Sequence, residues 1–186
     1  PSNSTTQQIS LAGTEAGTSL RCKLDTGSYA ACPSSPATFS GLGQGAHTLL
    51  VTQTDAAGNV SSAASVTWTV DSIAPGAPTI GFNRPAVTTV NSAAIGYSVP
   101  EPGGTFECSM DSAPWMPCPG NPVNLTSIPD GHHNYMIRQI DAAGNEGSVA
   151  QVAWVVDTAV PPTPTVALTS PTSSPTNQRT ASITAT

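Results

Sequence analysis

The sequence has few charged residues and few aromatic ones. Charged residues make up 9% of the chain and aromatic residues 5%, and the five Lys and Arg residues do not cluster. With a formal net charge of −6, the chain has no electrostatic reason to bind nucleic acid or an anionic membrane surface. No apolar run approaches the ~20 residues that a membrane-spanning helix needs. The composition therefore argues against nucleic-acid partners and against membrane insertion.

Proline and glycine are abundant instead. The chain has 18 prolines and 16 glycines, spread without a collagen-like period. Such a composition suits many short strands connected by turns. Several short runs alternate apolar and polar residues, whereas helical periodicity of useful length is missing. The sequence therefore predicts an all-β protein.

The pentapeptide DAAGN occurs twice, at Asp55–Asn59 and again 86 positions later at Asp141–Asn145. The same offset relates pairs of cysteines, histidines, tryptophans and aspartates along the chain. These pairs are Cys22 with Cys108, Cys32 with Cys118, His47 with His133, Trp68 with Trp154, and Asp71 with Asp157. The pentapeptide is therefore part of an internal repeat.

Two proline-rich segments, Asp71–Pro78 and Asp157–Pro164, occupy matching positions in this repeat, and each follows an alternating apolar run. Paired prolines interrupt strand pairing and stiffen a short connection, so both segments are predicted to be linkers between modules. They divide the chain into three units, residues 1–71, 72–157 and 158–186.

The phase of the repeat predicts what each unit contains. Pro1 matches Val87, and residues 163–186 match residues 77–100. We therefore expect a first module that lacks its opening strand, a complete second module, and the opening strands of a third. We also expect the chain to be a segment of a longer polypeptide.

The complete unit contains several candidate strands separated by turn sequences. The clearest are Asn91–Val99, Thr105–Met110, Pro122–Ile128, His133–Ile140 and Val149–Val156. Two-residue alternation places Val152, Trp154 and Val156 on one face of the last strand. About seven short, turn-linked strands in a unit of this length predict a small β-sandwich.

One motif order runs through Leu20–Pro75 and again through Phe106–Pro161. It reads F/L-x-C-x-L/M-D, then C-P, G-x-H, D-A-A-G-N and W-x-V-D-x-x-x-P. This order resembles the bacterial immunoglobulin-like repeat, which occurs in tandem arrays of large secreted or surface adhesin-type proteins. The resemblance implies tandem immunoglobulin-like β-sandwiches joined by short Pro-rich linkers, in an extracellular or cell-surface protein.

The cysteines form two pairs with equal spacing, Cys22 with Cys32 and Cys108 with Cys118. Turn sequences lie between the members of each pair, so the two cysteines are predicted to face each other across a hairpin. We expect two local disulfides, which would place the protein outside the cytoplasm. A zinc site and reduced thiols are the less favoured alternatives, because zinc needs further ligands nearby.

The sequence shows no catalytic constellation. The serines lack a G-x-S-x-G motif, and no histidine and carboxylate follow a recognisable triad signature. His47 and His133 follow glycine turns at the starts of predicted strands, where a structural role is expected. We therefore expect that the protein is not an enzyme and that it has no certain cofactor.

Acidic residues are predicted to gather where the modules join. In a sandwich, the incoming linker, the loop after the second strand and the last hairpin lie at one end, which would bring Asp71, Glu101 and Asp141 together. Asp157 repeats the position of Asp71 at the next junction. Such oxygen ligands would suit calcium. In the favoured interpretation, Asp55 and Asp141 instead cap their hairpin turns through the backbone.

The function predicted from these features is that of a structural or adhesive stalk or spacer. Its expected partners are neighbouring modules of the same or another chain, and a surface receptor or glycan. One alternative is a filament subunit assembled by strand donation, in which residues 163–170 dock on the first module of a neighbour. Another is an accessory or carbohydrate-binding module of a secreted enzyme, with Trp115 and Tyr29 as aromatic candidates at the hairpin tips.

Overall fold

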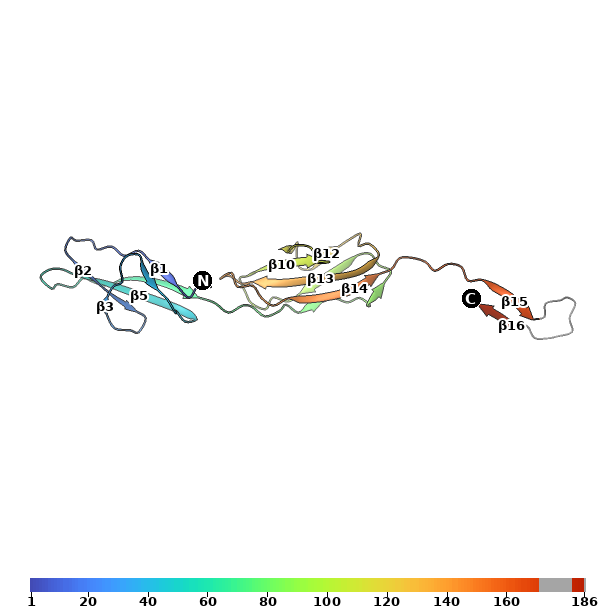
Figure 1. Ribbon diagram of the computed structural model, residues 1–186, viewed down its shortest axis with the longest axis horizontal. Coiled ribbons are helices and arrows are strands. Elements are labelled where there is room, and N and C mark those ends of the chain that lie inside the picture. Colours follow the sequence, from blue (N-terminus) through green and yellow to red (C-terminus); the bar gives the residue numbers. More distant parts are fainter. Residues whose placement is uncertain (171–181, 186) are drawn as a thin grey trace.

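The computed structural model describes residues 1–170 and 182–185. Figure 1 shows two β-modules placed end to end, followed by an extended segment and a two-stranded hairpin. All regular elements of these residues are strands, so the predicted all-β fold is confirmed. Within the described ranges, no helix has the length and apolarity to cross a bilayer.

The second module is a sandwich of two sheets. Its strands are β7 (Ile80–Gly81), β8 (Val87–Thr88), β9 (Ala93–Tyr97), β10 (Thr105–Met110), β11 (Met116–Pro117), β12 (Val123–Leu125), β13 (Gly131–Ile140) and β14 (Ala150–Val156). One sheet has the order β11-β10-β13-β14-β8 and the other the order β12-β9-β7. The opening strand is thus split, because β7 pairs antiparallel with β9 in one sheet while β8 pairs parallel with β14 in the other.

Side chains from both sheets meet in one core. The buried members come from β9, β10, β12, β13, β14 and the loop before β13, and they are Ala93, Ile95, Cys108, Val123, Ile128, Tyr135, Ile137, Trp154 and Val156. The alternation predicted for the last strand is confirmed. Trp154 and Val156 are buried and Val152 packs against the core, whereas Gln151 and Ala153 are exposed. The fold is therefore an immunoglobulin-like β-sandwich.

The first module repeats this plan with fewer strands. They are β1 (Gln7–Ile9), β2 (Ser19–Leu24), β3 (Ala30–Ala31), β4 (Ala37–Phe39), β5 (Gly45–Thr54) and β6 (Ala64–Val70). One sheet has the order β3-β2-β5-β6, and β1 pairs with β4 in the other. At the repeat offset, β1 takes the place of β9 and β6 the place of β14.

Residues near Ser2 occupy the place of β8 in the first module. Ser2 makes a parallel bridge to Val70, as Thr88 of β8 does to Val156. The described residues contain no counterpart of β7 in the first module, so β1 has β4 as its one partner there.

The third unit contains β15 (Val166–Ser170) and β16 (Ser182–Ala185), which pair antiparallel. β15 falls where the repeat predicts an opening strand. Other parts of the predicted third unit, residues 171–181 and 186, lie outside the described residues.

Both modules carry the predicted disulfides. Cys22 is bonded to Cys32 and Cys108 to Cys118, with Cα–Cα distances of 4.9 and 5.0 Å. In the second module the bond ties β10 to the residue that follows β11, and the Cys118 amide donates to the Phe106 carbonyl oxygen at 3.0 Å. Disulfides of this kind indicate a setting outside the cytoplasm.

We expect the double variant Cys108→Ser/Cys118→Ser to unfold its module at lower denaturant concentration. Closing a short loop stabilises a fold by roughly 2–3 kcal/mol in the chain-entropy model, and the small core offers little compensation. Equilibrium unfolding of the variant and the parent chain measures the change, while the intact Cys22–Cys32 module serves as internal reference. Peptide mapping of the non-reduced parent chain should show both local bonds, and a Cys22–Cys108 link would contradict this pairing.

Candidate functional site

The second DAAGN segment forms the turn between β13 and β14. Asp141 Oδ1 accepts hydrogen bonds from the backbone amides of Ala143 and Asn145, both at 2.8 Å. Gly144 has a φ of 90°, a backbone conformation that glycine adopts without steric cost. Asp141 is only 6% exposed. The aspartate thus caps its hairpin turn, as the favoured interpretation of the sequence predicted.

The turn also sets the charge state of its carboxylate. Burial by itself would raise the pKa of Asp141, but hydrogen bonds from Asn145 and from the amides of Ala143 and Gly144 lower this pKa below its ordinary value. A lowered pKa contributes stability that is present above the ordinary Asp pKa and is lost as the pH falls through the lowered value. The turn is therefore formed with a charged carboxylate at neutral pH.

Asn145 connects this turn to the preceding module. Its Nδ2 donates to Asp141 Oδ2 at 2.7 Å and to the Asp71 carbonyl oxygen at 2.7 Å. Asp71 is the residue that follows β6, the last strand of the first module. The final residue of the pentapeptide therefore reaches out of its own module and holds the end of the other. We call this contact the Asn145 clasp.

Asp71 is held from the first module as well. Its amide donates to the Ser2 carbonyl oxygen at 2.9 Å, and its Oδ1 accepts a hydrogen bond from Gln44 Nε2 at 2.8 Å. Gln44 Oε1 in turn accepts from the Ser72 amide at 2.8 Å. Because Asp71 is bonded on both sides, it is the fixed point between the modules.

The linker then packs along the second module. Ser148 donates its amide to the Pro75 carbonyl oxygen at 3.2 Å, and Pro75 and Pro78 are both buried. Gly147 permits this approach, because a Cβ at this position would lie 2.9 Å from the Pro75 oxygen and 3.0 Å from Pro75 Cγ. The proline-rich segment is therefore a docked part of the second module.

Of the other two carboxylates proposed as calcium ligands, Glu101 lies near the end of β13 that Asp141 follows, whereas Asp157 follows β14. Gln139 is fully buried and bonds both backbone groups of Glu101, which places Glu101 beside the end of β13. Asp157 follows β14 at the opposite end of the module (Figure 1), and its Oδ1 accepts from the Ala159 amide at 3.1 Å. In the part of the chain that the structure describes, no three His, Cys, Asp or Glu residues are grouped to hold a metal ion. Calcium binding at Asp71, Glu101 and Asp141 stays a prediction.

A histidine–aspartate pair stabilises each module. His133 Nδ1 lies 2.8 Å from Asp111 Oδ2, and its Nε2 lies 2.8 Å from the Pro129 carbonyl oxygen. The ring also lies 5.6 Å from that of Trp154. In the first module, His47 contacts Asp25, Gly43 and Trp68 in the same way. Both ring nitrogens face acceptors, and only the protonated imidazole can donate to both.

The two partners shift each other's titration. Burial by itself lowers the pKa of His133, but the hydrogen bonds to Asp111 and to Pro129 raise this pKa above its ordinary value. Burial by itself raises the pKa of Asp111, but His133 and the Asn134 amide lower it. The charged pair is therefore the form that stabilises the fold.

The aromatic residue at the tip of the β10–β11 hairpin is covered on one side. The Arg138 guanidinium carbon lies 4.7 Å from the centre of the Trp115 ring. Arg138 also bonds Glu107 at 2.7 Å and Glu146 on the next strand connection. Tyr29, at the matching position of the first module, is 38% exposed. Trp115 thus takes part in a charged surface cluster of its own module.

Gln44 and Gln139 are the residues that sequence reasoning missed. A signal for the second was present, since Gln53 repeats Gln139 at the offset of 86 and its Oε1 accepts from the Thr14 amide at 2.8 Å. Gln44 has no identical counterpart, because Asp130 stands at the matching position and bonds Thr158. Only the contacts reveal that Gln44 and Asp130 each hold the start of a linker, at Ser72 and Thr158.

Comparisons with known proteins give a structural likeness but no match in sequence. No protein-family profile matches the chain, and no curated protein matches it in sequence. Among solved structures, the fibronectin(III)-like modules of Clostridium thermocellum CbhA are similar, with 16% sequence identity and a TM-score of 0.41. That match covers 83% of this chain and 86% of the other.

We expect His133→Gln to weaken the pH dependence of stability in the second module. A raised histidine pKa contributes stability that is fully present below the ordinary value of about 6.5 and is lost as the pH rises through the raised value. The free energy of unfolding of the parent chain should therefore fall over that range, and less so in the variant. His132→Gln, at the exposed neighbouring position of β13, is the control and should keep the full dependence. Equal slopes for the two variants would contradict this role of His133.

We expect small-angle scattering profiles to be identical with and without a calcium chelator, because hydrogen bonds already engage both oxygens of Asp141. The carboxylates would then act as turn caps and linker contacts. A longer or looser particle after chelation, reproduced by Asp71→Ala without chelator, would instead support calcium at Asp71, Glu101 and Asp141.

Proposed function

We propose that this chain is a spacer segment of an extracellular or cell-surface bacterial repeat protein. Its immunoglobulin-like modules hold each other in an extended row and present distant parts of the parent protein away from a surface. The observation that carries this proposal is the Asn145 clasp on the Asp71 carbonyl oxygen.

The clasp suits a repeated joint because each module contributes both halves of it. The DAAGN turn supplies the donor at one end of a module, and the Asp that follows the last strand supplies the acceptor at the other end. The first module forms the same turn, with Asn59 Nδ2 donating to Asp55 Oδ2 at 2.8 Å. Modules that carry both halves can be joined in series without a new kind of contact.

The chemistry of the joint also favours a mechanical role. A neutral amide donating to a carbonyl contributes about 1 kcal/mol and is not screened by salt as an exposed ion pair is. Pro75 and Pro78 are buried, and the contact of Pro75 with Ser148 fixes the linker on the second module beside this joint. The angle between the modules is therefore expected to be independent of ionic strength, which suits a protein exposed to a changing medium.

We propose that the chain performs no catalysis and that its partners are neighbouring modules, with a receptor or glycan bound elsewhere in the parent protein. The rival proposal of a carbohydrate-binding module needs an open aromatic face. Arg138 lies over one face of Trp115, and this contact favours the spacer over that rival.

Asn145→Ala should loosen the joint while both modules stay folded. The variant removes the donor to Asp71, so the two modules should sample more angles, and small-angle scattering should show a broader distance distribution. Asn59→Ala is the matched control, since it removes the same turn contact in the first module without touching the joint.

In both variants, the amide resonances from the strands of both modules should keep their native chemical shifts in nuclear magnetic resonance spectra, which shows that both modules stay folded. If Asn145→Ala scatters as Asn59→Ala does, the clasp does not set the joint and the spacer proposal loses its basis.

A further inference from the structure

The triplet N-x-S/T, in which x is not proline, begins at three positions of the chain. They are Asn3, Asn59 and Asn124. In proteins outside the cytoplasm, this triplet is the acceptor for an N-linked sugar, and an acceptor has to lie on the surface. The two disulfides indicate such a setting. The contacts of each Asn side chain decide which of the three can react.

Asn59 is part of the first DAAGN turn. Its Nδ2 donates to Asp55 Oδ2 and its backbone amide donates to Asp55 Oδ1, both at 2.8 Å. Hydrogen bonds to a carboxylate are roughly twice as strong as those between neutral groups. A sugar can be transferred to the amide nitrogen only if the side chain leaves this partner. Asn59 is therefore held in the turn that it closes.

Asn3 faces the second module. Its Nδ2 lies 3.5 Å from the carbonyl oxygen of Gly144, in the second DAAGN turn. The adjacent residue of that turn, Asn145, donates to the Asp71 carbonyl oxygen at the joint. A sugar on Asn3 would therefore stand between the modules and compete with the contact that joins them.

Asn124 is held much more weakly than these two. It lies in the middle of β12, where Val123 is fully buried and Asn124 is exposed. Its Nδ2 donates to the Pro122 carbonyl oxygen at 3.4 Å, which is long for an N–H donor. Thr126, the third residue of the triplet, is exposed as well. The acceptor amide and the threonine of this triplet therefore both face solvent.

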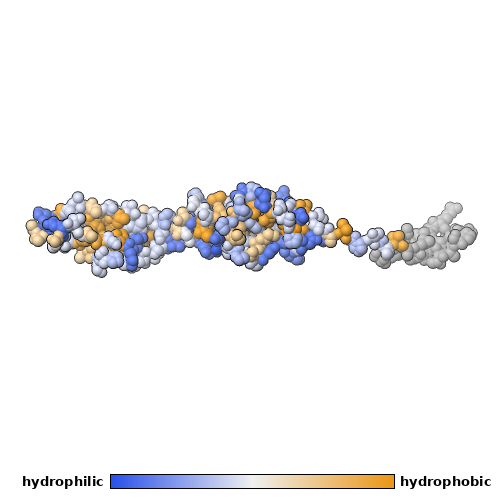
Figure 2. Space-filling view, turned by 90° about the horizontal axis from the view of Figure 1, so that it is seen from above, coloured by the Kyte–Doolittle hydropathy of each residue, from blue (hydrophilic) through white to orange (hydrophobic). Residues whose placement is uncertain are grey.

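The surroundings of Asn124 leave room for a sugar and for the enzyme that transfers it. β12 is an edge strand of the three-stranded sheet, and β9 is its one partner among the described strands. The residue opposite Asn124 on β9 is Ala94, which is small and exposed. Hydrophilic and apolar residues are interspersed over the face of the second module that Figure 2 shows. A polar sugar is compatible with a surface of this kind.

The sandwich itself does not need an asparagine at this position. The matching residue of the first module is Thr38, which is exposed in the middle of β4. Asn121, by contrast, has a structural task, because its Nδ2 donates to the Tyr97 carbonyl oxygen at 2.7 Å and ties a loop to β9. The amide of Asn124 holds no other strand or loop, so it can react without cost to the fold.

We propose that Asn124 is an N-glycosylation site. The co-substrate is a sugar activated by a pyrophosphate, on a nucleotide or on a lipid carrier, and an N-glycosyltransferase reads the triplet through Thr126. Asn124 Nδ2 forms a bond to C1 of the sugar while the bond from C1 to the phosphate oxygen breaks. The pyrophosphate leaves with the electron pair, and one Nδ2 proton passes to a base of the transferase. This modification goes beyond the spacer role, which does not require it.

Intact mass spectrometry of the folded chain tests the proposal, after incubation with a soluble N-glycosyltransferase and UDP-glucose. The parent chain should gain one hexose. Asn124→Gln should gain none, and neither should Thr126→Val, which keeps the acceptor amide, whereas Thr126→Ser should restore the gain. Asn59→Gln is the matched control and should gain one hexose like the parent. A parent chain that gains no sugar, or a gain that survives Asn124→Gln, overturns the proposal.

Peptide mapping of the protein isolated from its own source shows whether the site is used and which donor supplies it. A single hexose on Asn124 would indicate a nucleotide-activated donor, and a preassembled oligosaccharide would indicate a lipid-linked donor. Asn124 without any sugar overturns the proposal. The spacer proposal is judged separately, because the Asn145→Ala comparison measures the joint, to which Asn124 makes no contact.

Discussion

The arrangement of the two modules depends on the turn that Asp141 caps. Its carboxylate fixes the backbone of the β13–β14 hairpin and at the same time orients the Asn145 side chain toward the linker. The cap adds to the pairing of β13 with β14, the strand that carries Trp154 into the core. The side chains of Asp141 and Asn145 therefore close the hairpin and also hold the neighbouring module.

A small core explains why the module relies on so many local ties. Few large apolar side chains are available in a chain with 5% aromatic residues, so burial alone stabilises each sandwich weakly. The disulfide on β10, the His133–Asp111 pair and the buried Gln139 each fix a loop to the strand beside it. These ties repeat in the first module at the disulfide and the histidine, and in altered form at Gln53.

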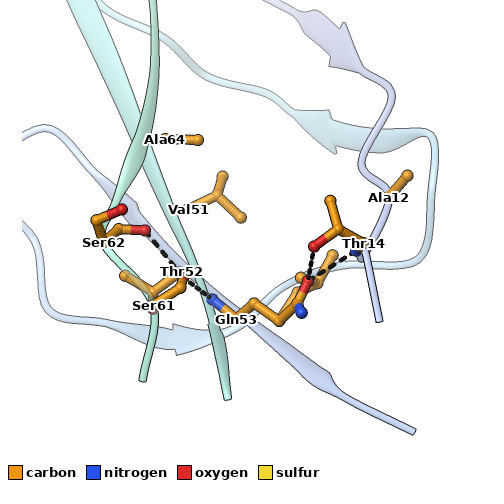
Figure 3. Close-up of a pocket in the computed structure, with 9 residues that line it drawn as sticks. Ala12, Thr14, Val51, Thr52, Gln53, Ser61, Ser62 and Ala64 are labelled. Carbon is orange, nitrogen blue, oxygen red and sulfur yellow. Dashed lines mark hydrogen bonds between the residues drawn. The ribbon is translucent and has the colours of Figure 1, made fainter. Parts of the chain in front are cut away.

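The two modules differ most where the chain enters them. Gly147 lets Pro75 approach the second module closely, but Ser61 stands at the matching position of the first and its hydroxyl accepts from the Gln53 amide at 3.0 Å. The pocket beside Ser61, shown in Figure 3, therefore differs in shape from the site on the second module where Pro75 packs against Gly147.

The sequence alone determined the repeat, the strand pattern, the cysteine pairing and the buried face of the last strand. These follow from local rules, because alternation and turn residues act within a few positions and an exact offset carries them from one module to the next. It also indicated that Asp141 caps a turn. Only the tertiary structure decided that Asn145 donates to Asp71 and that Pro75 docks on Gly147. Such contacts join residues tens of positions apart, and their partners are fixed by how the sheets and modules pack in space, which no local pattern encodes.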